Sequence, residues 1–135
     1  MAGELFEGTW KLALEKSRIA ADLQIEEIIM TITRIGPNSF RTVQDITFKS
    51  GEKRHQEFDR TLDGKEHSVA ATASDDHQRS IIARRIDANT REITNKLDGK
   101  VTEKVVSVVA PDGHSMKNVE HESSGNEWVS IYVRP

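Results

Sequence analysis

The chain contains no cysteine, which excludes disulfide bonds, thiolate metal sites and a thiol nucleophile. Proline is scarce, with 3 residues in 135, and aromatic residues make up only 5% of the sequence. Apolar runs are no longer than three residues, whereas a membrane-spanning helix needs roughly 20. Residues 1–7 include two acids and lack the cationic start and apolar run of a signal peptide. These absences predict a cytoplasmic protein with no membrane span.

An excess of one charge is also missing. The 19 basic residues nearly balance the 22 acidic residues, for a net charge of -3, and both signs are scattered along the chain. A nucleic-acid-binding domain normally gathers basic residues into a patch or stripe, so we expect no nucleic-acid partner. The length falls within the usual size of one domain, and residues 1–135 are predicted to form a single domain.

A regular series of turn signals runs through the chain. Asp-Gly pairs tolerate the positive φ angles of tight hairpins. Turns separated by about 8 to 12 residues are typical of an all-β sandwich or barrel, and the slightly wider spacing here favours the longer strands of a barrel. The turn signals are Gly36-Pro37-Asn38, Ser50-Gly51, Asp63-Gly64, Ser74-Asp75-Asp76, Asp87-Ala88-Asn89, Asp98-Gly99, Asp112-Gly113 and Ser124-Gly125.

Between the turns, apolar and polar residues alternate with the period of a β-strand. Phe40, Thr42 and Ile46 lie on one face of their segment, and Arg41 and Asp45 lie on the other, as in a half-buried strand. The predicted strands are Gly8–Glu15, Glu27–Ile35, Ser39–Lys49, Lys53–Leu62, His67–Ala73, Arg79–Ile86, Arg91–Leu97, Lys100–Ala110, Ser115–Ser123 and Asn126–Arg134.

One segment interrupts the alternation. Ser17 to Gln24 contains helix formers such as Ala20 and Leu23, and is either a short helix or a loop. An open sheet of ten consecutive antiparallel strands would expose its edges, and closing the meander removes them. The predicted fold is therefore all-β: an up-and-down antiparallel β-barrel of about 8 to 10 strands with at most one short helix after the first strand.

Several short motifs resemble those of a known group of proteins. Residues 5–12, LFEGTWKL, are similar to the glycine-x-tryptophan first strand of the calycins, the group that includes lipocalins and intracellular fatty-acid-binding proteins. Residues 85–90, 97–100 and 131–134 resemble uncharacterised bacterial lipocalin-like proteins. Together with the strand meander, the resemblance extends over nearly the whole chain. It implies a lipocalin-like barrel that binds or carries a small hydrophobic molecule.

The resemblance also implies a structural role at the barrel floor for Gly8, Trp10 and Arg134. If the barrel closes, the last strand lies beside the first, which brings Arg134 near Trp10. A guanidinium over an indole face contributes roughly 0.5 to 2 kcal/mol, and in lipocalins the matching pair closes the floor. The alternative is that Trp10 is an ordinary core residue and Arg134 is solvated.

The chain departs from the fatty-acid-binding proteins in two features. Glu15 to Glu26 is too short for the helix-turn-helix lid that those proteins carry between their first two strands. They also hold the ligand carboxylate with an inward arginine two residues before a tyrosine on the last strand. Tyr132 matches the tyrosine, but Ser130 stands at the arginine position. The resemblance therefore does not imply carboxylate binding by that route.

The candidate ligand site lies mainly on the last hairpin. A two-residue turn at Ser124-Gly125 would pair His121 with Trp128 and place both on one face with Ser130 and Tyr132. Such a mixed apolar and polar face is typical of ligand pockets, although a hydrogen-bonded core or surface cluster is the alternative. A slip of one residue in register would turn these side chains outward. The candidate ligand-binding residues are Phe40, Arg84, His121, Trp128, Ser130 and Tyr132, and Arg84 or Lys104 would anchor an anionic head group.

The histidines give little support to metal chemistry. They are dispersed, with no pair at metal-ligand spacing, so we predict no metal and no cofactor. A haem-binding calycin, the nearest alternative, would use His121 as its single ligand. The five histidines are His55, His67, His77, His114 and His121.

Catalytic patterns are equally thin. Acidic residues on predicted strands, such as Glu57, Asp59, Glu103, Glu120 and Glu122, could supply a carboxylate pair for a barrel enzyme. Carboxylates that alternate along a strand are usually on its solvated face. We therefore expect binding of a small hydrophobic ligand rather than catalysis. A filled barrel that serves only as a structural or interaction domain is the remaining alternative.

Overall fold

The computed structural model describes residues 5–69 and 78–135, in which every regular element is a β-strand except two short 3-10 turns. No helix within these residues is long and apolar enough to cross a bilayer. The strands are β1 (Gly8–Leu12), β2 (Ile25–Arg34), β3 (Ser39–Phe48), β4 (Lys53–Thr61), β5 (Glu66–Val69), β6 (Arg79–Asp87), β7 (Thr90–Leu97), β8 (Lys100–Val109), β9 (Ser115–Glu122) and β10 (Glu127–Val133), and the turns are η1 (Leu14–Lys16) and η2 (Ala21–Leu23).

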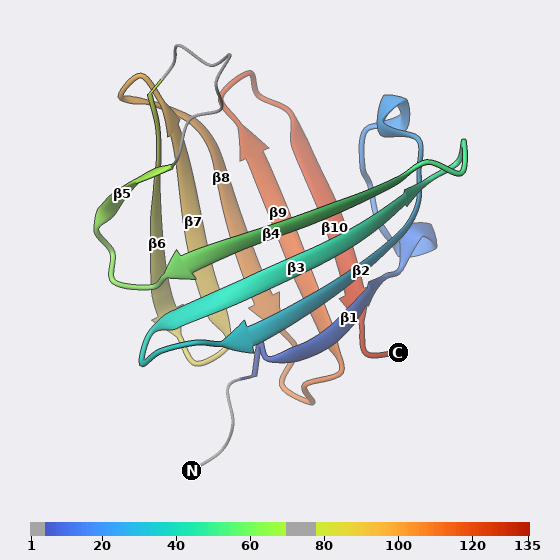
Figure 1. The fold of residues 1–135 in the computed structure, drawn as a ribbon, viewed down its shortest axis with the longest axis horizontal. Coiled ribbons are helices and arrows are strands. Elements are labelled where there is room, and N and C mark those ends of the chain that lie inside the picture. The colour runs from blue at the N-terminus through green and yellow to red at the C-terminus, as the bar shows by residue number, and fades with distance from the viewer. Residues whose placement is uncertain (1–4, 70–77) are drawn as a thin grey trace.

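The ten strands form one antiparallel sheet that curls into a barrel (Figure 1). Neighbours in sequence pair with each other from β1 to β4 and from β5 to β10, and β1 also pairs with β10. In Figure 1 the strands β1–β4 cross in front of β6–β10. Within the part of the chain that the structure describes, β4 and β5 are the two edge strands and share no backbone ladder. The predicted up-and-down barrel is confirmed, with an opening between β4 and β5.

Most strands begin and end within two residues of the predicted bounds. β1 ends at Leu12 rather than Glu15, because the chain enters η1 at Leu14. The segment that interrupts the alternation contains η2. The predicted strand from His67 corresponds to β5, and residues 70–73 of that prediction lie outside the described residues. The alternation on β3 is confirmed, since Phe40 and Ile46 are buried and Arg41 is exposed.

The register of the last hairpin differs by one residue from the prediction, which is therefore wrong on this point. Trp128 pairs with Glu120, whereas the predicted turn pairs it with His121. The loop consists of residues 123–125 and is closed by a backbone hydrogen bond between the residues that flank it. A three-residue hairpin loop needs a positive φ near its end, and Gly125 adopts φ +100°. The extra loop residue reverses the face to which each side chain of β9 points relative to β10.

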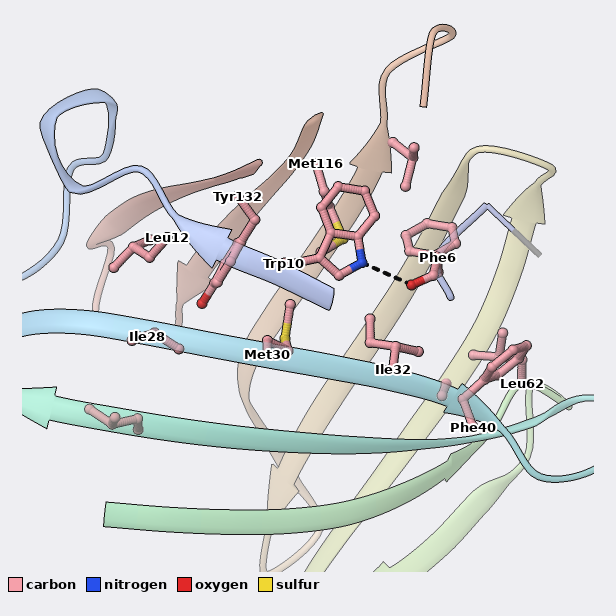
Figure 2. Close-up of a cluster of buried hydrophobic side chains, with 13 residues drawn as sticks. Phe6, Trp10, Leu12, Ile28, Met30, Ile32, Phe40, Leu62, Met116 and Tyr132 are labelled. Atoms are coloured by element: carbon pink, nitrogen blue, oxygen red, sulfur yellow. Dashed lines mark hydrogen bonds between the residues drawn. The ribbon is translucent and has the colours of Figure 1, made fainter. Parts of the chain in front are cut away.

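Phe6 of the N-terminal segment and Trp10 of β1 lie side by side in the hydrophobic core (Figure 2). Phe6 and Trp10 have no exposed surface, and Nε1 of Trp10 donates a hydrogen bond to the Phe6 carbonyl at 3.0 Å. Arg134, one residue beyond β10, donates from its guanidinium to the carbonyls of Leu5 (2.9 Å) and Glu7 (2.6 Å). The end of the last strand is thus tied to the segment that precedes the first.

Candidate functional site

A cavity of about 890 Å³ lies between β1–β2 and β8–β10, with η2 forming part of its wall. Ligand pockets in proteins usually measure about 300 to 1,000 Å³ and are lined mainly by apolar side chains with a few polar groups. The cavity is therefore large enough for one small molecule. Its apolar lining comes from Leu12, Ile19, Leu23, Ile25, Ile28, Val105, Trp128 and Tyr132.

A smaller cavity of about 250 Å³ adjoins the first, and Val105 and Asn118 line both. Arg60 and Arg91, which the sequence did not single out as site residues, line the smaller cavity. Cζ of Arg91 lies 4.0 Å from the ring centre of Phe6, and burial lowers the pKa of Arg60. A guanidinium stays protonated under any ordinary condition. The wall of the smaller cavity therefore contains two positively charged side chains.

Three of the six predicted ligand residues lie on the larger cavity. Trp128, Ser130 and Tyr132 alternate along β10, and all three line the cavity wall. Tyr132 is buried, and the loss of contact with water raises the pKa of its phenol to about 12. The phenol therefore remains neutral and can donate or accept a hydrogen bond.

The other three predicted residues lie elsewhere. Phe40 is 1% exposed and packs in the hydrophobic core. Arg84 points to the outer surface, because the preceding residue of β6 is buried and alternate side chains face opposite ways; its Nε lies 3.0 Å from Glu92. His121 also faces outward, because of the register of the hairpin, with Nδ1 3.3 Å from Glu127. Neither Arg84 nor His121 is placed to contact a ligand or haem inside the barrel.

The remaining histidines of the described chain do not converge. His55 lies on the outer surface between Asp45 and Glu57, at 2.6 and 2.8 Å, and its hydrogen bonds to these carboxylates raise its pKa. His67 contacts Asp63 at 2.8 Å. Lys104, the second predicted head-group anchor, is exposed. The predicted turn histidine at position 77 lies outside the described residues.

Three acidic residues form a carboxylate cluster in the barrel wall. Carboxylate oxygens of Glu103, Glu120 and Glu122 all lie within 4.8 Å of one another. Glu103 on β8 pairs with Glu122 on β9. Glu120 precedes Glu122 by two residues on β9, so the two side chains lie on the same face. Glu120 and Glu122 line the larger cavity, and Glu103 lines the smaller one. The expectation that these carboxylates occupy a solvated strand face is therefore wrong for this cluster.

The environment of Glu120 favours the protonated acid. Burial is the largest cause, followed by a hydrogen bond with Glu103 and by the negative charges of Glu103 and Glu122, and together they raise the pKa of Glu120 to about 8. Nδ2 of Asn95 donates to Glu103 at 2.7 Å, and Nε1 of Trp128 donates to Glu122 at 2.9 Å. Neutral donors thus hold the carboxylates of Glu103 and Glu122 in place. The cluster as a whole carries negative charge.

The cluster offers oxygen ligands to a cation. With one ligand oxygen from each carboxylate, the cluster supplies three of the six to eight oxygens that Ca²⁺ usually takes in proteins. A protonated amine, in contrast, needs about three acceptors. The polar residues Asn118, Glu120 and Glu122 stand at every second position of the sequence, and this was the signal available for the cluster. Whether they face the interior or the solvent depends on the length of the hairpin loop.

Neither a protein-family model nor a curated protein matches this sequence. Solved structures do resemble it over nearly its whole length. A fatty-acid-binding protein from Schistosoma mansoni in complex with arachidonic acid has a TM-score of 0.70 at 17% identity, covering 98% of this chain and 99% of that one. The fluorescent protein UnaG has a TM-score of 0.68 at 16% identity, covering 96% and 97%.

A further structural neighbour is fatty-acid-binding protein 1 from Echinococcus granulosus, with a TM-score of 0.64 at 18% identity over 98% of both chains. Likeness at this level of identity concerns the fold. The chain has the all-β barrel fold that its sequence predicts, and the solved structures that resemble it include fatty-acid-binding proteins.

Proposed function

We propose that this protein binds a small hydrophobic molecule inside its barrel. The observation that carries the proposal is the 890 Å³ cavity, whose wall combines apolar side chains with a few polar groups from five strands and η2. A barrel packed solid by side chains would have left no such space. Support also comes from the structural neighbour that holds arachidonic acid in the same fold.

Within this proposal, Trp128 and Tyr132 form the aromatic side of the ligand site and Ser130 lies between them on β10. A ligand lying along this wall buries apolar surface at about 25 cal/mol per Å². Ser130 would leave space for the ligand, since a serine occupies much less volume than the aromatic residues on either side. A structural barrel without a ligand fits less well than a binding protein, because it gives the cavity no role.

A fluorescence titration with the neutral lipophile Nile red tests the proposal. The protein should bind Nile red saturably, with a blue-shifted emission. Ser130→Phe places an aromatic ring in the cavity and should strongly weaken binding, whereas Thr9→Phe, at an exposed position of β1, should leave binding intact. Absence of saturable binding, or equal binding by the Ser130→Phe variant, would support the structural alternative.

We also propose that the protein is located in the cytoplasm. A chain without cysteine is suited to a reducing compartment. Fractionation of cells that produce the protein, followed by detection with an antibody, measures its location directly; recovery in the extracellular or envelope fraction would contradict the assignment.

A further inference from the structure

The ionisable residues on the larger cavity are of one kind. Its lining includes the acids Asp22, Glu120 and Glu122 and the phenol of Tyr132, and among the described residues it includes no lysine, arginine or histidine. Glu103 adds a third carboxylate to the cluster from the adjoining wall. A ligand that enters this cavity therefore meets negative charge and hydrogen-bond acceptors beside an apolar surface.

A neutral polar group on the same wall lacks a hydrogen-bond donor. Oδ1 of Asn118 is buried and has no hydrogen-bond partner within residues 5–69 and 78–135. Asn118 precedes Glu120 by two residues on β9, so both side chains face the interior, and both line the larger cavity. A buried acceptor without a partner destabilises the free protein, because it has lost its hydrogen bonds to water without replacing them. The carbonyl oxygen of Asn118 would be satisfied by a donor that a ligand brings.

We infer that the larger cavity binds an apolar molecule that carries a protonated amine, with the ammonium group at Glu120 and Glu122 and the apolar part along Trp128, Tyr132 and Ile28. This inference rests on the proposed binding function and specifies the ligand class. An ammonium group has three donors and no acceptor, and it forms charge-assisted hydrogen bonds with carboxylates.

Other head groups fit this wall less well. The carboxylate of a fatty acid would add a like charge to the cluster, which disfavours its ionised form. The two arginines that could hold it lie in the smaller cavity of about 250 Å³, where Arg91 already packs against the rings of Phe6 and Phe40. A divalent metal ion would find carboxylate oxygens on one side and apolar side chains on the others, short of a full coordination shell.

Binding of an ammonium group should also release a proton. In the free protein Glu120 holds its proton at pH 7, because its pKa is raised to about 8. A positive charge beside the carboxyl lowers this pKa. Glu120 then ionises, and its proton passes to the buffer. The charged groups that act on Glu120 are Glu103 of β8 and Glu122 of β9, and neutral Trp128 pairs with it from β10.

The decisive experiment compares dodecylamine, dodecanol and dodecanoate, which share one chain length, by isothermal titration calorimetry at pH 7. Dodecylamine should bind at least about tenfold more tightly than the other two, the equivalent of one charge-assisted hydrogen bond. Titrations in two buffers with different heats of ionisation should show release of a proton with dodecylamine and none with dodecanol.

Two glutamine variants test whether Glu120 and Glu122 bind the ammonium group. Glu120→Gln and Glu122→Gln keep the side-chain shape and should each lower the affinity for dodecylamine about tenfold, with dodecanol binding unchanged as evidence that the cavity is intact. Glu26→Gln, at an exposed position of β2, is the matched control and should have no effect.

Several results would overturn the inference. Dodecanol binding as tightly as dodecylamine, or unchanged amine affinity in both glutamine variants, would show that the carboxylates do not select the ligand, while the proposed function would stand. Tighter binding of dodecanoate would place the head group at Arg60 and Arg91. Saturable binding of Ca²⁺ alone, lost in the variants, would assign the cluster to a metal. If neither the three ligands nor Nile red binds, the proposed function itself fails.

Discussion

The guanidinium of Arg134 lies over the indole of Trp10, with Cζ 3.8 Å from the ring centre. The same guanidinium donates hydrogen bonds to backbone carbonyls of Leu5, Glu7 and Gly113. One side chain therefore joins the N-terminal segment, the last strand and the loop between β8 and β9, and it covers the largest residue of the core. We therefore expect this arrangement to stabilise the floor of the barrel.

Arg134→Lys should destabilise the protein by about 1 to 3 kcal/mol, because an ammonium group cannot reproduce the planar fork that reaches three separate carbonyls. Urea denaturation followed by circular dichroism measures the loss. Arg84→Lys, which alters only an exposed ion pair with Glu92, is the control and should cost less than about 1 kcal/mol. Equal losses in the two variants would show that the network at the floor is unimportant.

Gly8→Ala should be destabilising as well. Gly8 has φ +119°, a conformation that residues with a side chain rarely adopt, and an added Cβ would collide with Nη1 of Arg134. The combined strain and displacement of the guanidinium should cost about 1 to 3 kcal/mol. The double variant Gly8→Ala/Arg134→Lys should lose less than the sum of the two single losses, because they affect one contact. Strict additivity in denaturation experiments would contradict the close approach.

Trp10→Ala should be the most damaging single truncation. Trp10 is completely buried and contacts the core around Phe6, and truncation of a buried tryptophan typically costs about 3 to 5 kcal/mol. The variant should be poorly soluble, since this is a large share of the roughly 5 to 15 kcal/mol of a small domain. Trp128→Ala is a matched comparison, because Trp128 is only partly buried on the cavity wall. If the free energy of unfolding of Trp10→Ala lies within about 1 kcal/mol of the parent value, Trp10 does not have its expected role at the floor.

Tyr132→Phe should affect ligand binding more than stability. Tyr132 lines the cavity, so removal of its hydroxyl leaves the packing of the ring unchanged. A neutral hydrogen bond contributes roughly 0.5 to 1.5 kcal/mol, and the affinity for a ligand that bonds the hydroxyl should fall by that amount. Paired denaturation and ligand titrations give both quantities. A larger loss of stability than of affinity would mean that the hydroxyl belongs to a core network.

Stability should fall as the pH rises through the range set by Glu120. Its pKa is raised to about 8 in the folded protein, from the value of 4.5 that is usual for a glutamate side chain. Between these values the unfolded chain loses the proton and the folded protein keeps it, so the slope of stability with pH is negative. The loss stops above about pH 8, where both states are ionised.

Urea midpoints from pH 4.5 to pH 9 test this dependence. The loss should be on the order of 1 to 2 kcal/mol, because Glu120 is only partly buried and solvent screens its charge. Glu120→Gln removes the titrating group and should be less sensitive to pH and more stable than the parent at pH 8. Parallel pH profiles for the two proteins would show that Glu120 titrates normally.

The sequence alone determined the architecture. Turn residues at regular intervals and the period-two alternation on segments such as the one from Phe40 to Ile46 are local properties, since a strand presents successive side chains to opposite faces whatever lies across from it. They predict ten strands, their order and most of their bounds. The glycine-x-tryptophan motif also predicted which residues lie together at the floor, because closure of a meander brings the first and last strands side by side.

Only the tertiary structure decided which residues line the cavity. The loop at residues 123–125 holds three residues instead of two, and this difference turns His121 outward and Glu120 inward. The pairing of Glu103 with Glu122 and the donors that hold them come from the four consecutive strands β7 to β10, and they depend on the register of those strands. No local pattern distinguishes an alternating carboxylate on a solvated face from one in a barrel wall, because the two differ only in register, and register is set by loop geometry and by the packing of the whole sheet.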